Sequence, residues 1–169
     1  MSSPIKFLIS FVGIVLFLVG IIWLASPSEK SQTASLQPQL SVNAALAAEE
    51  SFFDFGDISM SDGNVEHIFR VSNKGADLVN IAKLYTSCMC TKAIISASSG
   101  RKGPFGMPGH GFVPSADVVL NSGETAEVEV IYDPAAHGPS GIGRIERSVY
   151  LEGDAGSLVE LRIRATVTP

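Results

Sequence analysis

From Phe52 onward, apolar and polar residues alternate in short runs, which is typical of strands that bury one face. The clearest run is the last one, in which Val159, Leu161 and Ile163 alternate with charged residues. The runs are, in chain order, residues 53–55, 65–71, 78–86, 93–97, 118–120, 128–132, 145–151 and 159–167. This pattern predicts an all-β domain over residues 51–169, an immunoglobulin-like β-sandwich of about seven antiparallel strands.

Residues 98–116 interrupt the alternation. The segment is rich in glycine and contains Pro104, Pro108 and Pro114. Glycine and proline at this density disfavour a regular strand. We therefore expect a long loop inserted into the domain, and loops of this length in compact domains usually serve a function or are disordered.

The N-terminal region has a different pattern, because residues 7–25 carry no charge. Such a run of about nineteen residues is long enough to cross a bilayer as a helix. Lys6 precedes it, so the positive-inside rule predicts a single-pass cell-membrane protein whose C-terminal domain is extracytoplasmic, either periplasmic or extracellular. We expect a signal anchor or transmembrane helix in residues 1–26 and a flexible linker, rich in Ser, Ala, Gln and Pro, in residues 27–50. A cleaved secretory signal is the alternative, although Pro27 crowds the cleavage site that it would use.

The charge distribution and the absence of catalytic motifs argue against two classes of function, nucleic-acid binding and catalysis. The net charge is −5 and charges of both signs are interspersed, so the sequence has no basic stripe for nucleic acid. It has no G-x-S-x-G motif and no glycine-rich phosphate loop followed by a helix, and we expect neither an enzyme nor a small-molecule substrate. We expect instead a binding module that contacts another envelope protein. Phe105, Met107 and Phe112 in the inserted loop are candidates for the contact surface.

The two cysteines, Cys88 and Cys90, are separated by Met89 alone. A disulfide between residues i and i+2 closes a tight ring and is strained in an extended segment. Because soft sulfur ligands select Cu(I) or Zn²⁺, one hypothesis is a copper-binding or copper-delivery protein. In it, Cys88 and Cys90 hold one Cu(I) ion together with Met107 or His110, and the loop acts as a lid. The alternatives are a structural pair packed under the loop, a thiol redox protein and an intermolecular disulfide.

The two other histidines are expected to be structural. His67 lies on the same alternating face as Val65 and Phe69, so we expect a core-edge residue whose ring is hydrogen-bonded by backbone. His137 lies in a segment rich in proline and glycine, so we expect a solvated loop residue.

Several motifs follow one another in the folded region. They are F-D-F-G-D-I at 53–58, G-x-V-x-H-x-F at 63–69, N-x-G at 73–75, T-S-C-M-C-T at 86–91, N-S-G-E at 121–124 and V-I-Y-D-P at 130–134. With them, residues 52–167 resemble a bacterial extracytoplasmic family of unknown function that has F-x-F-G-x-I and C-G-C-T motifs. Its members are small Ig-like domains, often lipoproteins or membrane-anchored, and distantly similar to Hydin-type (ASH) domains. Met89 stands where that family has glycine. The resemblance implies the fold and leaves the function open.

Overall fold

The structure, a computed structural model, describes residues 46–109, 115–154, 156 and 158–169. These residues form ten β-strands and two short 3-10 helices, without an α-helix among them. They belong to one compact unit. The predicted membrane-spanning segment, residues 7–25, lies outside the described residues, and within the described ones no helix is both long and apolar enough to span a bilayer. The all-β prediction is confirmed for the part that the structure describes.

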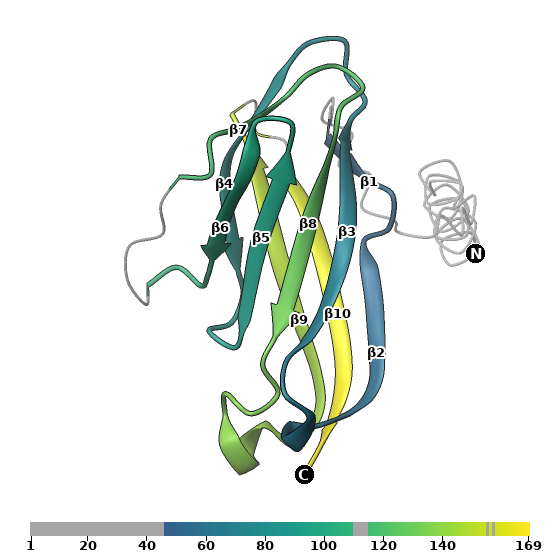
Figure 1. The fold of residues 1–169 in the computed structure, drawn as a ribbon, viewed down its shortest axis with the longest axis vertical. Helices are drawn as coiled ribbons and strands as arrows, with labels where there is room; N and C mark the ends of the chain where they lie inside the picture. Colours follow the sequence, from purple (N-terminus) through teal and green to yellow (C-terminus); the bar gives the residue numbers. More distant parts are fainter. Residues whose placement is uncertain (1–45, 110–114, 155, 157) are drawn as a thin grey trace, which may run out of the picture. The chain divides into compact units, whose positions relative to one another are not determined.

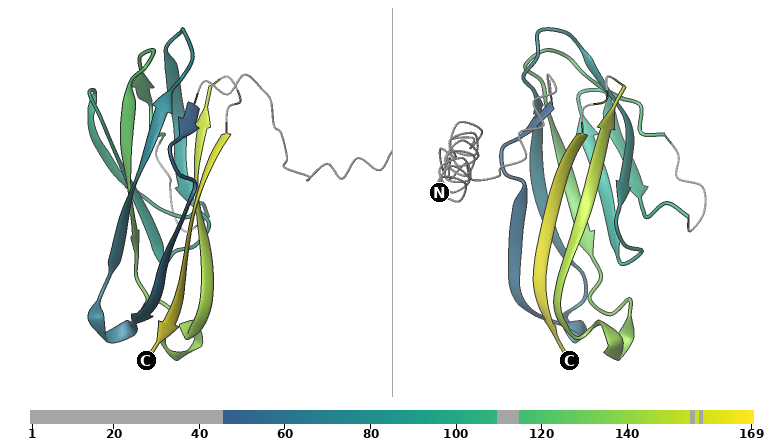
Figure 2. Two further views of the ribbon diagram at one scale, coloured as in Figure 1. Left: turned by 90° about the vertical axis from the view of Figure 1, so that its right-hand side faces the viewer. Right: turned by 180° about the vertical axis from the view of Figure 1, so that it is seen from behind.

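The strands form two five-stranded sheets that lie face to face (Figures 1 and 2). The first sheet has the order β1 (Leu46–Ala48), β3 (Val65–Asn73), β8 (Thr125–Tyr132), β5 (Thr91–Ala97), β6 (Gly100–Phe105). The second has the order β2 (Phe52–Ser59), β10 (Leu158–Thr168), β9 (Gly143–Gly153), β4 (Val79–Thr86), β7 (Val118–Leu120). The β2–β10 pair is parallel and the other pairs are antiparallel, which corrects the expectation of about seven strands that are all antiparallel.

The core lies between the two sheets and follows the alternation in the sequence. Phe69 and Val71 of β3, Val128 of β8, and Leu161 and Ile163 of β10 are fully buried. The side chains between them face outward, because successive residues of a strand point to opposite faces. Burial of these apolar surfaces is what closes an Ig-like sandwich without an inter-sheet disulfide.

Two strands lie where none is predicted. β1 falls in the segment assigned to the linker (27–50), so the folded region begins before residue 51. β6 falls in the segment assigned to a long loop (98–116). β6 is an edge strand, and there a proline such as Pro104 need not interrupt pairing on both sides. Gly103 has φ +123°, and a Cβ at this position would lie 2.9 Å from the Ala93 carbonyl oxygen, so glycine allows β6 to approach β5 closely.

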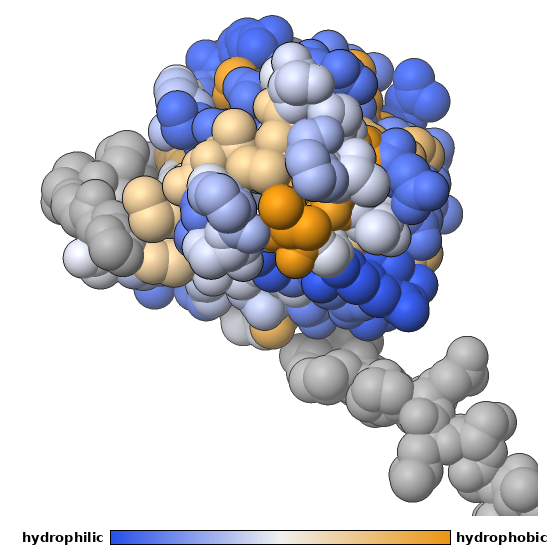
Figure 3. All heavy atoms as spheres, turned by 90° about the horizontal axis from the view of Figure 1, so that it is seen from below, coloured by the Kyte–Doolittle hydropathy of each residue, from blue (hydrophilic) through white to orange (hydrophobic). Residues whose placement is uncertain are grey.

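The two ends of the sandwich carry different turns and short helices. One end, here called the turn end, carries the turns after β3 and β5 and the turn before β8 (Figure 1). The other, here called the thiol end, carries η1 (Met60–Asp62), η2 (Gly138–Gly141) and the turn between β4 and β5. Viewed from below, the molecule shows a small apolar patch among hydrophilic residues (Figure 3). Met89 in the β4–β5 turn and Ile142, which follows η2, are 55% and 46% exposed.

Candidate metal centre

The Cys-Met-Cys motif lies in the turn that carries the chain from the second sheet to the first. β4 ends at Thr86 and β5 begins at Thr91. The backbone N–H of Thr91 donates to the Cys88 carbonyl at 3.1 Å. The buried hydroxyl of Thr86 lies 2.9 Å from the same carbonyl and 3.0 Å from that of Thr91. The backbone of the turn is therefore fixed by threonines, and neither cysteine side chain is needed to hold it.

Neighbouring strands clamp both sides of this turn. The N–H of Asp133 donates to the Cys90 carbonyl at 2.9 Å. Ser87 and Ser148 exchange two hydrogen bonds of 2.9 Å, because the Ser87 N–H donates to the Ser148 carbonyl and the Ser148 N–H donates to the Ser87 hydroxyl. Within this fixed turn Cys90 is buried, Cys88 is half-buried and Met89 is exposed. Both cysteines are free thiols.

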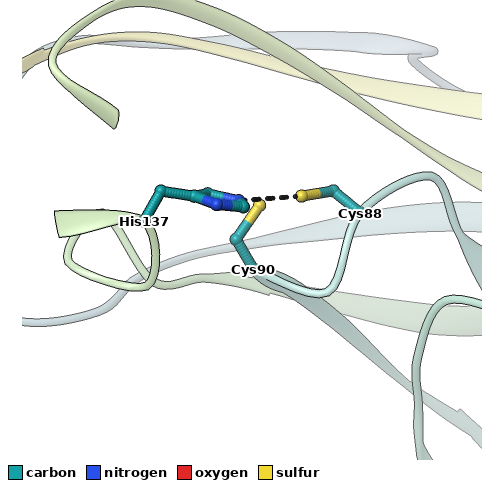
Figure 4. A group of neighbouring side chains, drawn as sticks. All are labelled: Cys88, Cys90 and His137. Carbon is teal, nitrogen blue, oxygen red and sulfur yellow. Dashed lines mark hydrogen bonds between the residues drawn. The ribbon is translucent and has the colours of Figure 1, made fainter. Parts of the chain in front are cut away.

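His137 lies against the thiols from a separate part of the chain (Figure 4). β8 ends at Tyr132, which is paired with Thr91 at the start of β5, so the chain that follows β8 returns over the β4–β5 turn. The Nε2 atom of His137 is 3.3 Å from the Cys88 sulfur. The two sulfur atoms and a ring nitrogen all lie within 4.8 Å of one another.

His137 is an exposed loop residue, as expected, but its contact with a thiol was not predicted. Its ring faces the Cys88 thiol, and local contacts shape the loop around it. The N–H of Gly138 donates to the Ala135 carbonyl at 2.9 Å, and the Ser140 hydroxyl donates to the His137 carbonyl at 2.6 Å. No periodic signal marks such a residue, since only the β5–β8 pairing brings its loop to the cysteines.

A cation, Arg147 of β9, completes the surroundings of the thiols. Its Nε–H donates to the Cys90 sulfur at 3.3 Å, and its Nη1 donates to the Glu146 carbonyl at 2.8 Å. Sequence reasoning missed this residue, because Arg147 is 57 positions from Cys90 and Lys92 is the nearest cation in sequence. The side chain of Lys92 is exposed, whereas that of Arg147 is half-buried beside the sulfur.

The environment separates the acidities of the two thiols. Burial raises the pKa of Cys88, but hydrogen bonds from Cys90 and His137 and the charge of Arg147 outweigh it and lower that pKa to about 7. Burial, followed by the hydrogen bond with Cys88, raises the pKa of Cys90, although its hydrogen bond with Arg147 opposes the change. The pair thus loses its first proton more readily than an ordinary cysteine does, and the second less readily.

The two other predicted ligands are Met107 and His110. Met107 is half-buried and follows Gly106, whose carbonyl accepts a 3.2 Å hydrogen bond from the N–H of Thr86. His110 lies outside the described residues. A role for Met107 or His110 as a copper ligand therefore stays a prediction, and His137 is the third ligand that the structure brings to the cysteines.

His67 is a core-edge residue, as expected, but its partners are side chains. Its ring stacks on Phe53 with centroids 3.7 Å apart and meets Phe69 edge-on at 4.7 Å. Its Nε2 lies 2.6 Å from a carboxylate oxygen of Glu50, where a backbone partner was expected. His67 therefore stabilises the fold through these contacts, on the face of β3 that packs on the core.

Two thiols and one imidazole form a set of soft and borderline ligands. Thiolate sulfur favours Cu(I), Zn²⁺ and iron–sulfur centres, whereas Ca²⁺ and Mg²⁺ require oxygen ligands. The described part of the cluster contains no carboxylate. The chemistry of Cys88, Cys90 and His137 therefore fits a soft metal ion held by three protein ligands.

Comparisons with known proteins agree with the fold and leave the function open. Among solved structures, a protein of unknown function from Porphyromonas gingivalis W83 superimposes with a TM-score of 0.52 at 12% identity, over 75% of this chain and 50% of that chain. This chain thus spans about half the length of that protein. The ASH/PapD-like domain 7 of human CEP192 aligns at 11% identity with a TM-score of 0.44, over 74% of this chain and 86% of that domain.

The family comparison covers the first part of the folded region. No curated protein matches the chain. Residues 46–106, which span β1 to β6 and include both cysteines, match the family described as "Protein of unknown function (DUF1573)". His137 and Arg147 lie beyond the matched residues. The resemblance to a family of unknown function is thereby confirmed over residues 46–106, whereas the motifs at 121–124 and 130–134 lie beyond the match.

Proposed function

We propose that this chain is a membrane-anchored, extracytoplasmic Ig-like binding module that holds one Cu(I) ion between Cys88, Cys90 and His137. The observation that carries the proposal is the convergence of two sulfur atoms and a ring nitrogen within 4.8 Å. These atoms come from two turns whose backbones are fixed by other residues, so the ligands are preorganised.

Coordination number and charge favour Cu(I) over Zn²⁺. Structural zinc sites almost always have four protein ligands, whereas the described cluster offers three. Two thiolates with one Cu(I) carry a net charge of −1, which the guanidinium of Arg147 beside Cys90 balances. With Zn²⁺ the same two thiolates would be neutral, and the half-buried Arg147 would lose its counter-charge.

The anchor, the location and the partner belong to the same proposal. The uncharged segment 7–25 after Lys6 supports a single-pass anchor with the folded domain outside the cytoplasm. A contact with another envelope protein is supported by Met89 and Ile142, two exposed apolar residues of the thiol end. Protease protection of the tagged C-terminus in intact and permeabilised cells tests the orientation, and accessibility from the cytoplasmic side would contradict it.

Anaerobic Cu(I) titration of the full chain in detergent, against a coloured Cu(I) chelator, tests the metal site. We expect one Cu(I) per chain, and its loss in the double variant Cys88→Ser/Cys90→Ser. Met89→Leu is the matched control, since Met89 lies between the two cysteines, is 55% exposed, and loses its sulfur atom in this variant. Copper uptake that the double variant retains, or that Met89→Leu abolishes equally, would overturn the assignment.

A thiol redox protein is the second candidate, favoured by the pKa of about 7 at Cys88 and by its contact with His137. In this reading two thiols would be oxidised while a partner disulfide is reduced to two thiols. An internal bridge between residues 88 and 90 would strain the turn. Counting free thiols after incubation with a small disulfide separates the two candidates, because rapid loss of both thiols without mixed disulfide would favour the redox reading.

A further inference from the structure

A cavity of about 330 Å³ lies beside the metal centre, lined by residues of η2 and β9. Two of its lining residues, His137 and Arg147, are the ones that contact the cysteine sulfurs. The cavity therefore borders the site through these two residues, although neither cysteine lines it. Its volume lies at the lower end of the range for pockets that bind small molecules.

The cavity is cationic in a chain whose net charge is −5. Arg144 and Arg147 line it, whereas no acidic side chain of the described residues does. Among ion pairs in the described ranges, none uses Arg144 or Arg147. The nearby carboxylate of Glu146 pairs instead with Arg162 and Arg164 on the adjacent strand. Because Arg147 is engaged with Cys90, Arg144 is the guanidinium of this cavity that is left to bind an anion, and arginine suits carboxylates in particular.

We propose that this cavity binds the carboxylate of a small anionic thiol, and that Cu(I) reaches Cys88 and Cys90 as the complex of that thiol. The inference rests on the proposed copper function and specifies the donor. Soft Cu(I) travels among thiolate ligands, so a donor that carries both a thiolate and a carboxylate places its metal beside His137 while Arg144 holds its charged end. A donor of this size fits the cavity, whereas a folded protein would have to insert a single side chain.

The transfer is a ligand exchange without a change of oxidation state. The bond between Cu(I) and the donor sulfur breaks as a bond to a cysteine sulfur forms. Bonds to both cysteine sulfurs form in turn, and of the two protons that Cys88 and Cys90 release, one goes to the departing donor thiolate and the other to water. Arg147 remains beside Cys90 throughout and balances the charge of the new complex.

The test compares two Cu(I) donors on the full chain in detergent: the complex of mercaptosuccinate, which has carboxylates, and that of 2-mercaptoethanol, which has none. We expect Arg144→Gln to slow transfer from mercaptosuccinate about tenfold, the effect of one charge-assisted hydrogen bond, and to leave transfer from mercaptoethanol unchanged. Arg70→Gln is the control, because it removes the same charge from an exposed position on the first sheet.

A second measurement separates this inference from the copper proposal. The S-methyl derivative of mercaptosuccinate keeps the carboxylates but cannot carry copper as a thiolate, and we expect it to bind the wild type and not Arg144→Gln. Failure of Cu(I) to bind from either donor would end the copper proposal, whatever the derivative does. Cu(I) transfer that is equal from both donors and insensitive to Arg144→Gln would overturn the inference alone. Binding of an acidic peptide in place of the derivative would also overturn it, in favour of a protein partner.

Discussion

The two ends of the sandwich both gather polar side chains between strands, but they use them for different purposes. At the turn end, the buried amide of Asn73 donates to the carbonyls of Asp77 at 2.8 Å and Leu120 at 3.0 Å. The carboxylate of Glu124 accepts the N–H groups of Asn121 and Ser98 at 2.9 and 3.2 Å. These side chains complete the hydrogen bonds of turn backbones, which buried backbone groups require.

At the thiol end, the polar side chains contact one another. The sulfur of Cys88 meets the ring of His137 and that of Cys90 meets the guanidinium of Arg147, while Thr86 holds the backbone of the turn. A thiol is a weak hydrogen-bonding group, so these contacts add little to the fold. At the turn end, the polar side chains hydrogen-bond to the backbone and so stabilise the fold. At the thiol end, the backbone does not need the side-chain cluster, which is therefore available to bind a ligand.

The largest effect that we expect is on copper at the thiol end. His137→Asn should weaken Cu(I) binding by more than about 100-fold, because loss of a ligand exceeds the 10–100-fold cost of changing the partners that surround ligands. His67→Asn is the matched control: it removes the stacking on Phe53 and should lower stability without affecting copper. Competition with a Cu(I) chelator and urea unfolding measure the two quantities. Equal Cu(I) affinities for the two variants would erase the distinction between the histidines.

The turn end should show the opposite behaviour. Asn73→Ala removes the donor of two buried carbonyls and should lower the free energy of unfolding by about 2–4 kcal/mol, with Cu(I) affinity unchanged. Urea denaturation measures the first and chelator competition the second. Asn64→Ala, at an exposed turn position, should cost far less. If Asn73→Ala weakened copper binding, the two ends would be coupled and the comparison would fail.

Period-two alternation predicted the parts of this fold that are decided locally. In β10 the sequence places apolar residues such as Leu161 and Ile163 on one face, and the structure buries that face. Alternation does not predict strands that form only because a neighbouring strand pairs with them. β1 has three residues and forms only against β3, and β6 contains Pro104 and Gly103 yet pairs with β5. Edge strands like these depend on their partners, which composition does not reveal.

Only part of the candidate site could be predicted from the sequence, because the other part depends on which strands pair. Cys88 and Cys90 are two positions apart, so their proximity follows from the chain itself. His137 reaches them because β8 pairs with β5 in one register, and Arg147 reaches them because β9 pairs with β4. From the sequence, Met107 and His110 are predicted as further copper ligands because of the chemistry of their side chains. Which loop covers a turn is a tertiary property, and no local pattern encodes it.

Acid should weaken the turn end through Glu124. Its hydrogen bond with the Ser98 hydroxyl and that with the Asn121 N–H lower its pKa from 4.5 to about 2. A carboxyl whose folded pKa is depressed contributes stability that is fully present above its unfolded pKa and is lost as the pH falls through its folded pKa. We therefore expect the wild type to lose this contribution between pH 4.5 and about 2, and Glu124→Gln to lack it at neutral pH.

Urea midpoints over this pH range measure the difference between wild type and Glu124→Gln. Glu127→Gln is the control, since this exposed carboxylate is paired with Arg70 on the neighbouring strand and takes no part in a turn. A gap between wild type and Glu124→Gln that stays constant with pH would contradict the role of Glu124 as a charged acceptor.

The smallest effect should come from Arg147, whose charge acts on the thiols. Burial raises the pKa of Cys88, while Cys90, His137 and lastly Arg147 lower it, so Arg147→Gln should move this pKa upward from about 7. Alkylation of Cys88 by iodoacetamide at neutral pH should then slow by less than about tenfold, since one pKa unit changes the thiolate fraction by at most that factor. Arg147→Lys should preserve more of the rate because it keeps the charge, and Lys92→Gln should leave it unchanged although Lys92 is closer in sequence. An alkylation rate that changed in Lys92→Gln and stayed constant in Arg147→Gln would contradict this prediction. It would mean that Lys92, the neighbour in sequence, sets the reactivity of Cys88.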